Sequence, residues 1–418
     1  MRDGMAGGEG SGAPAAIAGP GGQPAGSSAT SEDGLRASWR ERYSRQIRFA
    51  PIGEAGQLRL REASVLIAGC GALGASLAQH MARAGVGRIV IVDRDYVEFS
   101  NLHRQTLFDE EDARRVLPKA KAAETKLRRI NGEAIIEAHV ADISQHNIGK
   151  FAAGTDLILD GTDNAATRLL LCDEAFRLGI PFVYGGATAS QGMSAMLVPG
   201  RTACLSCLIG GEEEAEEGDS CDTRGVLSAT VELVVALQVA EAVKWLTGNR
   251  ESVRGTWLNA DIWNFAVREF KLPSGVASCG KCGCEARAIG SEAHSVEIGL
   301  RHRLHNSEDD NCSDDLDRES RLHVRRSAAL CGRDTVQVTL GFTLDLEREI
   351  NYLERLGCGM TVNPYLVKAE LPSPYTEKLV LFPDGRVLVQ GTSDMAEAER
   401  ICDEYLSREN RRAEGTAG

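Results

Sequence analysis

The chain has 418 residues, enough for one large domain and a smaller one, and it carries a formal net charge of -13 at pH 7. This negative charge argues against nonspecific binding to nucleic acid. No apolar run reaches the length of a membrane span, and the N-terminus has no apolar core resembling that of a signal peptide. We therefore expect a soluble, cytoplasmic protein without a membrane or nucleic-acid partner. Its 12 cysteines are expected to be thiols and metal ligands rather than a disulfide framework.

The chain begins with a stretch dominated by Gly, Ala, Ser and Pro. Residues 1–37 are predicted to be a disordered tail, because they cannot bury enough apolar surface to offset their conformational entropy. Residues 38–285 then alternate between apolar runs and helical stretches, which predicts an α/β fold with a Rossmann-like, doubly wound parallel sheet and helices on both faces. The predicted strands lie near residues 64–68, 88–92, 134–140, 156–160 and 181–185.

The first predicted strand leads into a glycine motif. Gly69, Gly71 and Gly74 have the G-x-G-x-x-G spacing, and apolar residues at helical spacing follow. The second strand ends at Asp93, about 20 residues after the last glycine, where an acid typically bonds ribose hydroxyls. The motif predicts a bound nucleotide but does not distinguish NAD from ATP. The alternative is a glycine turn that only packs a helix.

The segment after Asp93, RDYVEFSNLHRQTLF, is too polar for a strand. It contains Asn101, Arg104 and Gln105 at the C-terminal edge of the sheet, where open α/β sheets bind their ligands. A triphosphate needs cations beyond the glycine loop, and Arg104 and Lys119 could supply them. Taken alone, either residue is more commonly a solvated surface charge.

Two acids lie at the end of the predicted strand 156–160 and just after it, in the sequence LDGTDN. Asp163 is well placed to hold a Mg²⁺ ion that bridges phosphate oxygens, because Mg²⁺ prefers carboxylate and phosphate ligands. Asp160 is interpreted as a cap or turn acid.

Two C-x-x-C pairs, about 70 residues apart, predict a tetrahedral structural zinc site. The expected ligands are Cys204, Cys207, Cys279 and Cys282. Cys284 could shift the register of the second pair, and we choose Cys282 because C-x-x-C is the usual spacing.

Another cysteine, Cys221, lies outside both pairs and just before a long apolar helix predicted to begin near Gly225. A helix N-terminus and the nearby Arg224 favour its thiolate. The acidic run at 212–217 would oppose this if it lay close.

Residues 286–325 are polar and acidic and are predicted to be a linker. Residues 326–410 are predicted to form a small α+β module, with a hairpin around Asp384 and Gly385. Cys331 in this part is interpreted as a buried or incidental thiol, with a sulfur relay as the alternative.

The ordered set RYSRQI, GCGALG, VDRDYVEFSNLHRQ, PKA, LDGTDN and the two C-x-x-C pairs resembles the ubiquitin-activating-like ThiF/MoeB/HesA family of adenylyltransferases. It is most similar to the bacterial enzymes that activate sulfur-carrier proteins for molybdopterin and thiamin synthesis. The resemblance covers roughly residues 40–285. It implies ATP-dependent adenylation of the C-terminal Gly-Gly carboxylate of a ubiquitin-like sulfur-carrier protein, with release of pyrophosphate. It also implies Mg²⁺, structural Zn²⁺ and a homodimer.

The resemblance also assigns roles to individual residues. Asp93 would hold the ATP ribose, and Asp163 would serve the Mg²⁺ ion. Arg45 would reach into the ATP site of the second subunit. Cys221 would form a thioester or persulfide-linked intermediate with the carrier, the alternative being a structural thiol. The residues expected to line the phosphates are Asn101, Arg104, Gln105 and Lys119.

The C-terminal module does not resemble the rhodanese domain that some relatives append, so sulfur would have to come from a separate donor protein. Three other functions remain open from the sequence. They are adenylation of a small-molecule or tRNA carboxylate, an NAD-dependent dehydrogenase, and a zinc-stabilised scaffold that binds a carrier without activating it.

Overall fold

The computed structural model describes residues 39–210, 224–283, 326–329 and 334–407. The described residues divide into two units, one ending at Ser44 and the other beginning at Arg45. The predicted tail, the predicted linker, and the three cysteines Cys221, Cys284 and Cys331 fall outside the described ranges. Within those ranges, no helix is both long enough and apolar enough to cross a membrane.

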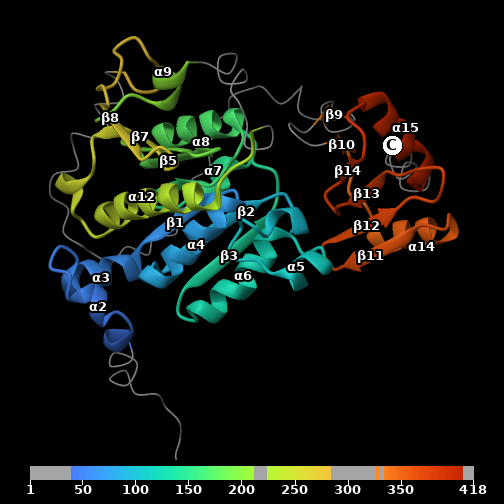
Figure 1. The fold of residues 1–418 in the computed structure, drawn as a ribbon, viewed down its shortest axis with the longest axis horizontal. Helices are drawn as coiled ribbons and strands as arrows, with labels where there is room; N and C mark the ends of the chain where they lie inside the picture. The colour runs from blue at the N-terminus through green and yellow to red at the C-terminus, as the bar shows by residue number, and fades with distance from the viewer. Residues whose placement is uncertain (1–38, 211–223, 284–325, 330–333, 408–418) are drawn as a thin grey trace, which may run out of the picture. The chain divides into compact units, whose positions relative to one another are not determined.

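The larger of two sheets has eight strands in the order β3-β2-β1-β4-β5-β6-β7-β8 (Figure 1). The strands are β1 (Ser64–Ala68), β2 (Arg88–Asp93), β3 (Ile135–Val140), β4 (Leu157–Asp160), β5 (Phe182–Thr188), β6 (Gln191–Leu197), β7 (Thr256–Asp261) and β8 (Ala266–Lys271). β1 to β5 pair in parallel, as predicted, and strand order reverses between β1 and β4. Open α/β sheets bind ligands at such a reversal.

The last three strands pair antiparallel, so the sheet is mixed rather than wholly parallel. The sequence analysis did not predict these strands. β5 and β6 are joined through the two residues Ala189 and Ser190. Such a short connection can join only antiparallel strands, because a parallel crossover needs a dozen or more residues.

Helices cover both faces of the parallel strands. One apolar core lies between the sheet and the helices α4, α6 and α12, and another lies between the sheet and α7, α8 and α9. The helices and 3₁₀ turns of this part are α2 (Ser44–Ile47), α3 (Gly53–Glu62), α4 (Ala72–Ala84), η1 (Phe99–Asn101), α5 (Glu110–Arg114), α6 (Lys119–Ile130), α7 (Ile148–Ala152), α8 (Ala165–Leu178), α9 (Leu205–Ile209), α12 (Ser228–Leu246) and η2 (Arg250–Ser252).

The second sheet has six strands in the order β11-β12-β13-β14-β10-β9, and every pair is antiparallel. Two helices, α14 and α15, contribute to the apolar core on one of its faces. The elements are β9 (Arg326–Ala329), β10 (Thr335–Thr339), α14 (Leu346–Arg355), β11 (Gly359–Asn363), β12 (Leu366–Glu370), β13 (Lys378–Leu381), β14 (Arg386–Gln390) and α15 (Met395–Tyr405). This is the predicted α+β module, with β9 and β11 as strands that the sequence analysis missed.

Candidate active site

The glycine loop connects β1 to α4 at the strand-order reversal. Gly69 has φ +82°, a backbone conformation that residues other than glycine rarely adopt. A Cβ atom there would lie 2.7 Å from the carbonyl oxygen of Gly161. A Cβ atom on Gly74 would lie 1.9 Å from the carbonyl oxygen of Gly69. At Gly71, by contrast, the nearest atom to an added Cβ is Nε2 of Gln105 at 3.8 Å. The loop therefore packs tightly against its own fold at two glycines and leaves space for a ligand at the third.

Asp93 ends β2 beside this loop. Its carboxylate accepts hydrogen bonds from the backbone N–H groups of Cys70 and Asp95, each at 2.6 Å. Desolvation raises the pKa of Asp93, and the positive charge of Lys119 opposes that rise. These contacts fix the carboxylate where β2 ends, next to the turn that faces the cavity.

Two cations approach the same place. Lys119, the first residue of α6, is 3% exposed, and its Nζ lies 3.1 Å from Oδ2 of Asp95. The guanidinium of Arg104 donates to the carbonyl of Ser100 at 3.1 Å. Arg104 forms no ion pair with any residue that the structure describes. No described carboxylate neutralises the charge of Arg104, so this guanidinium could bind an anionic ligand.

The connection from β4 to α8 is held rigidly at one end and exposed at the other. Asp160 is fully buried, accepts hydrogen bonds from the backbone and hydroxyl of Thr162 at 3.0 and 2.7 Å, and pairs with Nε of Arg168 at 3.0 Å. This arrangement agrees with its interpretation as a turn acid. Burial raises the pKa of Asp160, and the Arg168 guanidinium opposes that effect. Asp163, three residues on, is exposed to solvent.

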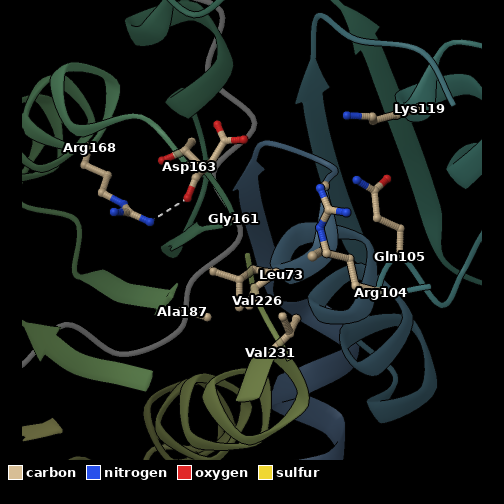
Figure 2. Close-up of a pocket in the computed structure, with 13 residues that line it drawn as sticks. Leu73, Arg104, Gln105, Lys119, Gly161, Asp163, Arg168, Ala187, Val226 and Val231 are labelled. Atoms are coloured by element: carbon tan, nitrogen blue, oxygen red, sulfur yellow. Dashed lines mark hydrogen bonds between the residues drawn. The ribbon is translucent and has the colours of Figure 1, made fainter. Parts of the chain in front are cut away.

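These groups surround two adjoining open cavities, each with about 550 Å³ of empty space when the solvent at its mouth is included. In Figure 2, Lys119 and Arg104 lie across the first cavity from Asp163, with apolar side chains, among them Leu73 and Val231, along its floor. The second cavity extends along the ends of β2 and β4 and includes Asp93. A site with cations, a free carboxylate and a glycine turn suits a nucleotide phosphate chain and a divalent cation.

Most of the residues predicted to bind nucleotide line these cavities. They are Gly69, Gly71, Asp93, Arg104, Gln105, Lys119 and Asp163. Gly74 acts through helix packing instead. Asn101 is 3% exposed, and its Oδ1 accepts a hydrogen bond from the backbone of Glu98 at 3.1 Å, so it stabilises the loop from behind. Arg45 is exposed on α2 and lines neither cavity of its own chain.

Several residues that line the cavities were not predicted from the sequence. Arg94 forms an ion pair with Asp142 at 3.1 Å, and both line the second cavity beside Asp95. Arg168, from the first turn of α8, lines the first cavity and donates to the carbonyls of Thr162 and Gly185 at 2.6 and 3.1 Å. The only signal in the sequence was the position of these residues just after strand ends.

The four predicted zinc ligands form one cluster, with all four sulfur atoms within 4.8 Å of one another. Sγ of Cys204 lies 3.8 Å from Sγ of Cys279, and Sγ of Cys207 lies 3.8 Å from Sγ of Cys282. A tetrahedral zinc ion with four Zn–S bonds of about 2.3 Å requires sulfur atoms roughly 3.8 Å apart. The cluster therefore fits a closed zinc site of the structural kind.

The chain matches a known protein family and is similar to curated proteins. The family model described as ThiF family matches residues 43–281. Sulfur carrier protein ThiS adenylyltransferase of Bacillus subtilis is 38% identical over 368 residues, which are 87% of this chain and 99% of that protein. Adenylyltransferase and sulfurtransferase MOCS3 of Anopheles gambiae is 37% identical over 241 residues, 58% of this chain and 54% of that protein. This chain thus spans about half the length of the MOCS3 relative.

Solved structures resemble the same part of the chain. The crystal structure of E. coli MccB with AMPCPP and MccA has a TM-score of 0.51 at 21% identity, covering 58% of this chain and 74% of that chain. Another crystal structure of E. coli MccB has a TM-score of 0.51 at 20% identity and covers 63% of this chain and 76% of that one. At these identities the likeness establishes the fold alone.

Proposed function

Because the chain belongs to the ThiF family and is an adenylyltransferase, we propose that it adenylates the C-terminal carboxylate of a ubiquitin-like sulfur-carrier protein that ends in Gly-Gly. The observation that carries the proposal is that the glycine turn, Arg104, Lys119 and Asp163 all line one cavity. A dehydrogenase would not require this set of charges. The match to the Bacillus subtilis protein over 99% of its length favours a carrier of the ThiS type.

The proposed reaction is an in-line displacement at the α-phosphorus of ATP. A carboxylate oxygen of the carrier forms a bond to this phosphorus, and the bond from the phosphorus to the bridging oxygen breaks. Pyrophosphate leaves with the electron pair, and the carrier is left as an acyl adenylate. Lys119 and Arg104 offset the charge that develops on the phosphate oxygens, while Asp93 holds the ribose.

We assign Asp163 to hold Mg²⁺, which would supply positive charge that offsets the charge of the phosphates. Its carboxylate is exposed and lines both cavities, so an ion could reach it from solvent. The cysteine cluster would hold Zn²⁺. Four thiolates leave no open position on the ion, so the zinc would stabilise the fold rather than react.

The active form we propose is a homodimer in the cytoplasm. Arg45 would reach into the ATP site of the second copy, which is consistent with its exposure on α2 and its absence from the cavities of its own chain. Cys221 would act after adenylation: its thiolate, or a persulfide made on it by transfer of sulfane sulfur from a donor, would attack the carrier's acyl adenylate, and AMP would leave as the thioester or persulfide-linked intermediate forms. A separate donor protein would supply the sulfur.

The deciding experiment measures the exchange of labelled pyrophosphate into ATP. Exchange should depend on a Gly-Gly carrier and disappear when the carrier lacks its last glycine. Because the carrier itself supplies the attacking oxygen, Cys221→Ala should retain exchange. Exchange that requires a small carboxylate instead of any carrier would contradict the proposed substrate, and binding of NAD without ATP would contradict adenylation.

A further inference from the structure

The small sheet buries both of its faces. Along β12, β13 and β14, alternate residues such as Val367 and Leu379 join the core that α14 and α15 help to form. The residues between them are buried as well: Leu366 and Val380 are 0% exposed. An antiparallel sheet with helices on one face commonly leaves its other face to water. Something other than those helices must therefore cover this second face.

The covering residues come from the nucleotide-binding part of the chain. Tyr96 and Val116 form one buried apolar cluster with four residues of the small sheet, and Val140 packs against it. The Nζ of Lys368 lies 5.2 Å from the centre of the Tyr96 ring. We call the four sheet residues the second face; they are Leu366, Val380, Phe382 and Leu388.

Tyr96 and Val116 belong to two segments that pair with each other beside the cavity. The N–H of Val97 donates to the carbonyl of Leu117 at 2.8 Å, and the N–H of Lys119 donates to the carbonyl of Asp95 at 2.9 Å. We call the paired segments 94–98 and 115–119 the ladder. Tyr96 packs on the second face, whereas its neighbour Asp95 lines the second cavity and pairs with Lys119.

The small sheet also holds both segments of the ladder by hydrogen bonds. Nδ2 of Asn363, at the end of β11, donates to the carbonyls of Arg115 and Val116 at 3.0 and 2.9 Å. Nη1 of Arg386, on β14, donates to the carbonyl of Arg94 at 3.1 Å. These bonds are made to backbone atoms, so they restrain the path of the ladder itself.

Val116 is the point where this restraint matters most. It has φ +49°, a left-handed conformation that is strained for a β-branched residue and persists only where the surroundings determine it. The Asn363 amide bonds the carbonyl of this same residue. Three residues later the chain reaches Lys119.

We propose that the C-terminal module positions the nucleotide site, with Asn363 as a positioning residue. Asn363 holds Val116 in its left-handed conformation and so fixes the ladder from which Lys119 reaches the phosphates of the nucleotide. The proposal rests on the proposed function for the identity of that nucleotide as ATP.

The test is the affinity of the full-length protein for Mg–ATP, measured by calorimetry without a carrier. Asn363→Asp keeps the oxygen that accepts from the backbone of Tyr365 and Leu366, whereas the donating Nδ2 is replaced by a carboxylate oxygen that cannot donate and repels the carbonyls of the ladder. It should raise the dissociation constant about tenfold, the factor equivalent to about 1.4 kcal/mol. Asn351→Asp is the matched control, because Asn351 donates within α14 and should leave the affinity unchanged.

Two further variants separate positioning from a general loss of structure. Val116→Gly, added to Asn363→Asp, should lower the dissociation constant again, because glycine adopts a positive φ without strain. Arg386→Lys should also weaken ATP binding. It serves as the test variant if Asn363→Asp does not fold.

Two results would overturn the positioning role. The first is wild-type affinity for ATP in Asn363→Asp, or in Arg386→Lys if that variant has to replace it. The second is a double variant, Val116→Gly with Asn363→Asp, that binds ATP no better than Asn363→Asp alone. A wild-type chain that binds ATP but shows no exchange would instead contradict the proposed substrate.

Discussion

Asp156 and Asp163 stand at opposite ends of β4, and their surroundings differ. Asp156 accepts a hydrogen bond from the backbone of Ser64 at 2.8 Å, whereas Asp163 lies exposed at the edge of both cavities. We predict that Asp163→Asn lowers carrier-dependent pyrophosphate exchange by at least about a hundredfold, the scale of losing one preorganised charge partner. Asp156→Asn keeps an accepting oxygen and should exchange at nearly the wild-type rate. Equal rates for the two variants would remove Asp163 from the metal site.

Among the residues predicted for the site, those in short motifs line the cavities. Gly71, Asp93 and Lys119 could be found because neighbouring residues in the chain define their environment. Arg94 and Asp142 could not, since their ion pair exists only because β2 and β3 end side by side. An ion pair between segments almost fifty residues apart requires the strand order, which no local pattern contains.

At the scale of elements, the approach of α4 to the sheet depends on Gly74. A Cβ atom there would lie 1.9 Å from the carbonyl oxygen of Gly69, and relieving this clash would require a shift of the backbone of α4 or of the glycine loop. Gly74→Ala should lower the free energy of unfolding by about 1–3 kcal/mol, the usual cost of overpacking. It should also weaken ATP binding, because it displaces the glycine turn.

The matched control for this prediction is Gly132→Ala, where the nearest atom to the added Cβ lies 3.8 Å away. Chemical denaturation and calorimetric titration with ATP measure the two effects. A Gly74→Ala protein as stable as Gly132→Ala would show that α4 can shift without cost.

The parallel strands were predictable because buried strands of this kind are nearly continuous apolar runs between helical stretches. β8 was not, since its residues are all exposed and AVREFK has no apolar run. In the small module, β12 and β13 were predicted, but the residues that cover their second face were not. The run KLVLF places apolar residues on both faces of β13, which indicates two covered faces. Only the structure identifies Tyr96 and Val116 as the cover.

For the molecule as a whole, the cysteine cluster ties together segments that are distant in sequence. Cys204 and Cys279 are separated by 75 positions, and Cys204 and Cys282 lie in the same apolar core as Leu272. The two C-x-x-C pairs were predictable because their spacing is local. Their meeting depends on the strands β7 and β8, which lead from α12 to Pro273, whose carbonyl accepts from the N–H of Ala203 at 2.9 Å, directly before the first cysteine pair.

We predict that removing zinc destabilises this domain before it alters the chemistry of the ATP site, because the binding energy of a structural metal is part of the folding energy. If the loss is about 3 kcal/mol, the melting temperature should fall by roughly 6–12 °C for a domain of this size. Calorimetry on chelator-treated protein, with the metal content measured in parallel, tests this.

Cys204→Ser combined with Cys207→Ser is the matched control, because it should melt at the lowered temperature already and respond no further to the chelator. Both pairs are needed to close a tetrahedral site, so loss of one pair should release the ion. If the metal-free protein melted at the same temperature as the metal-loaded one, the cluster would contribute nothing to folding, and four sulfurs within 4.8 Å would need another explanation, such as paired disulfides.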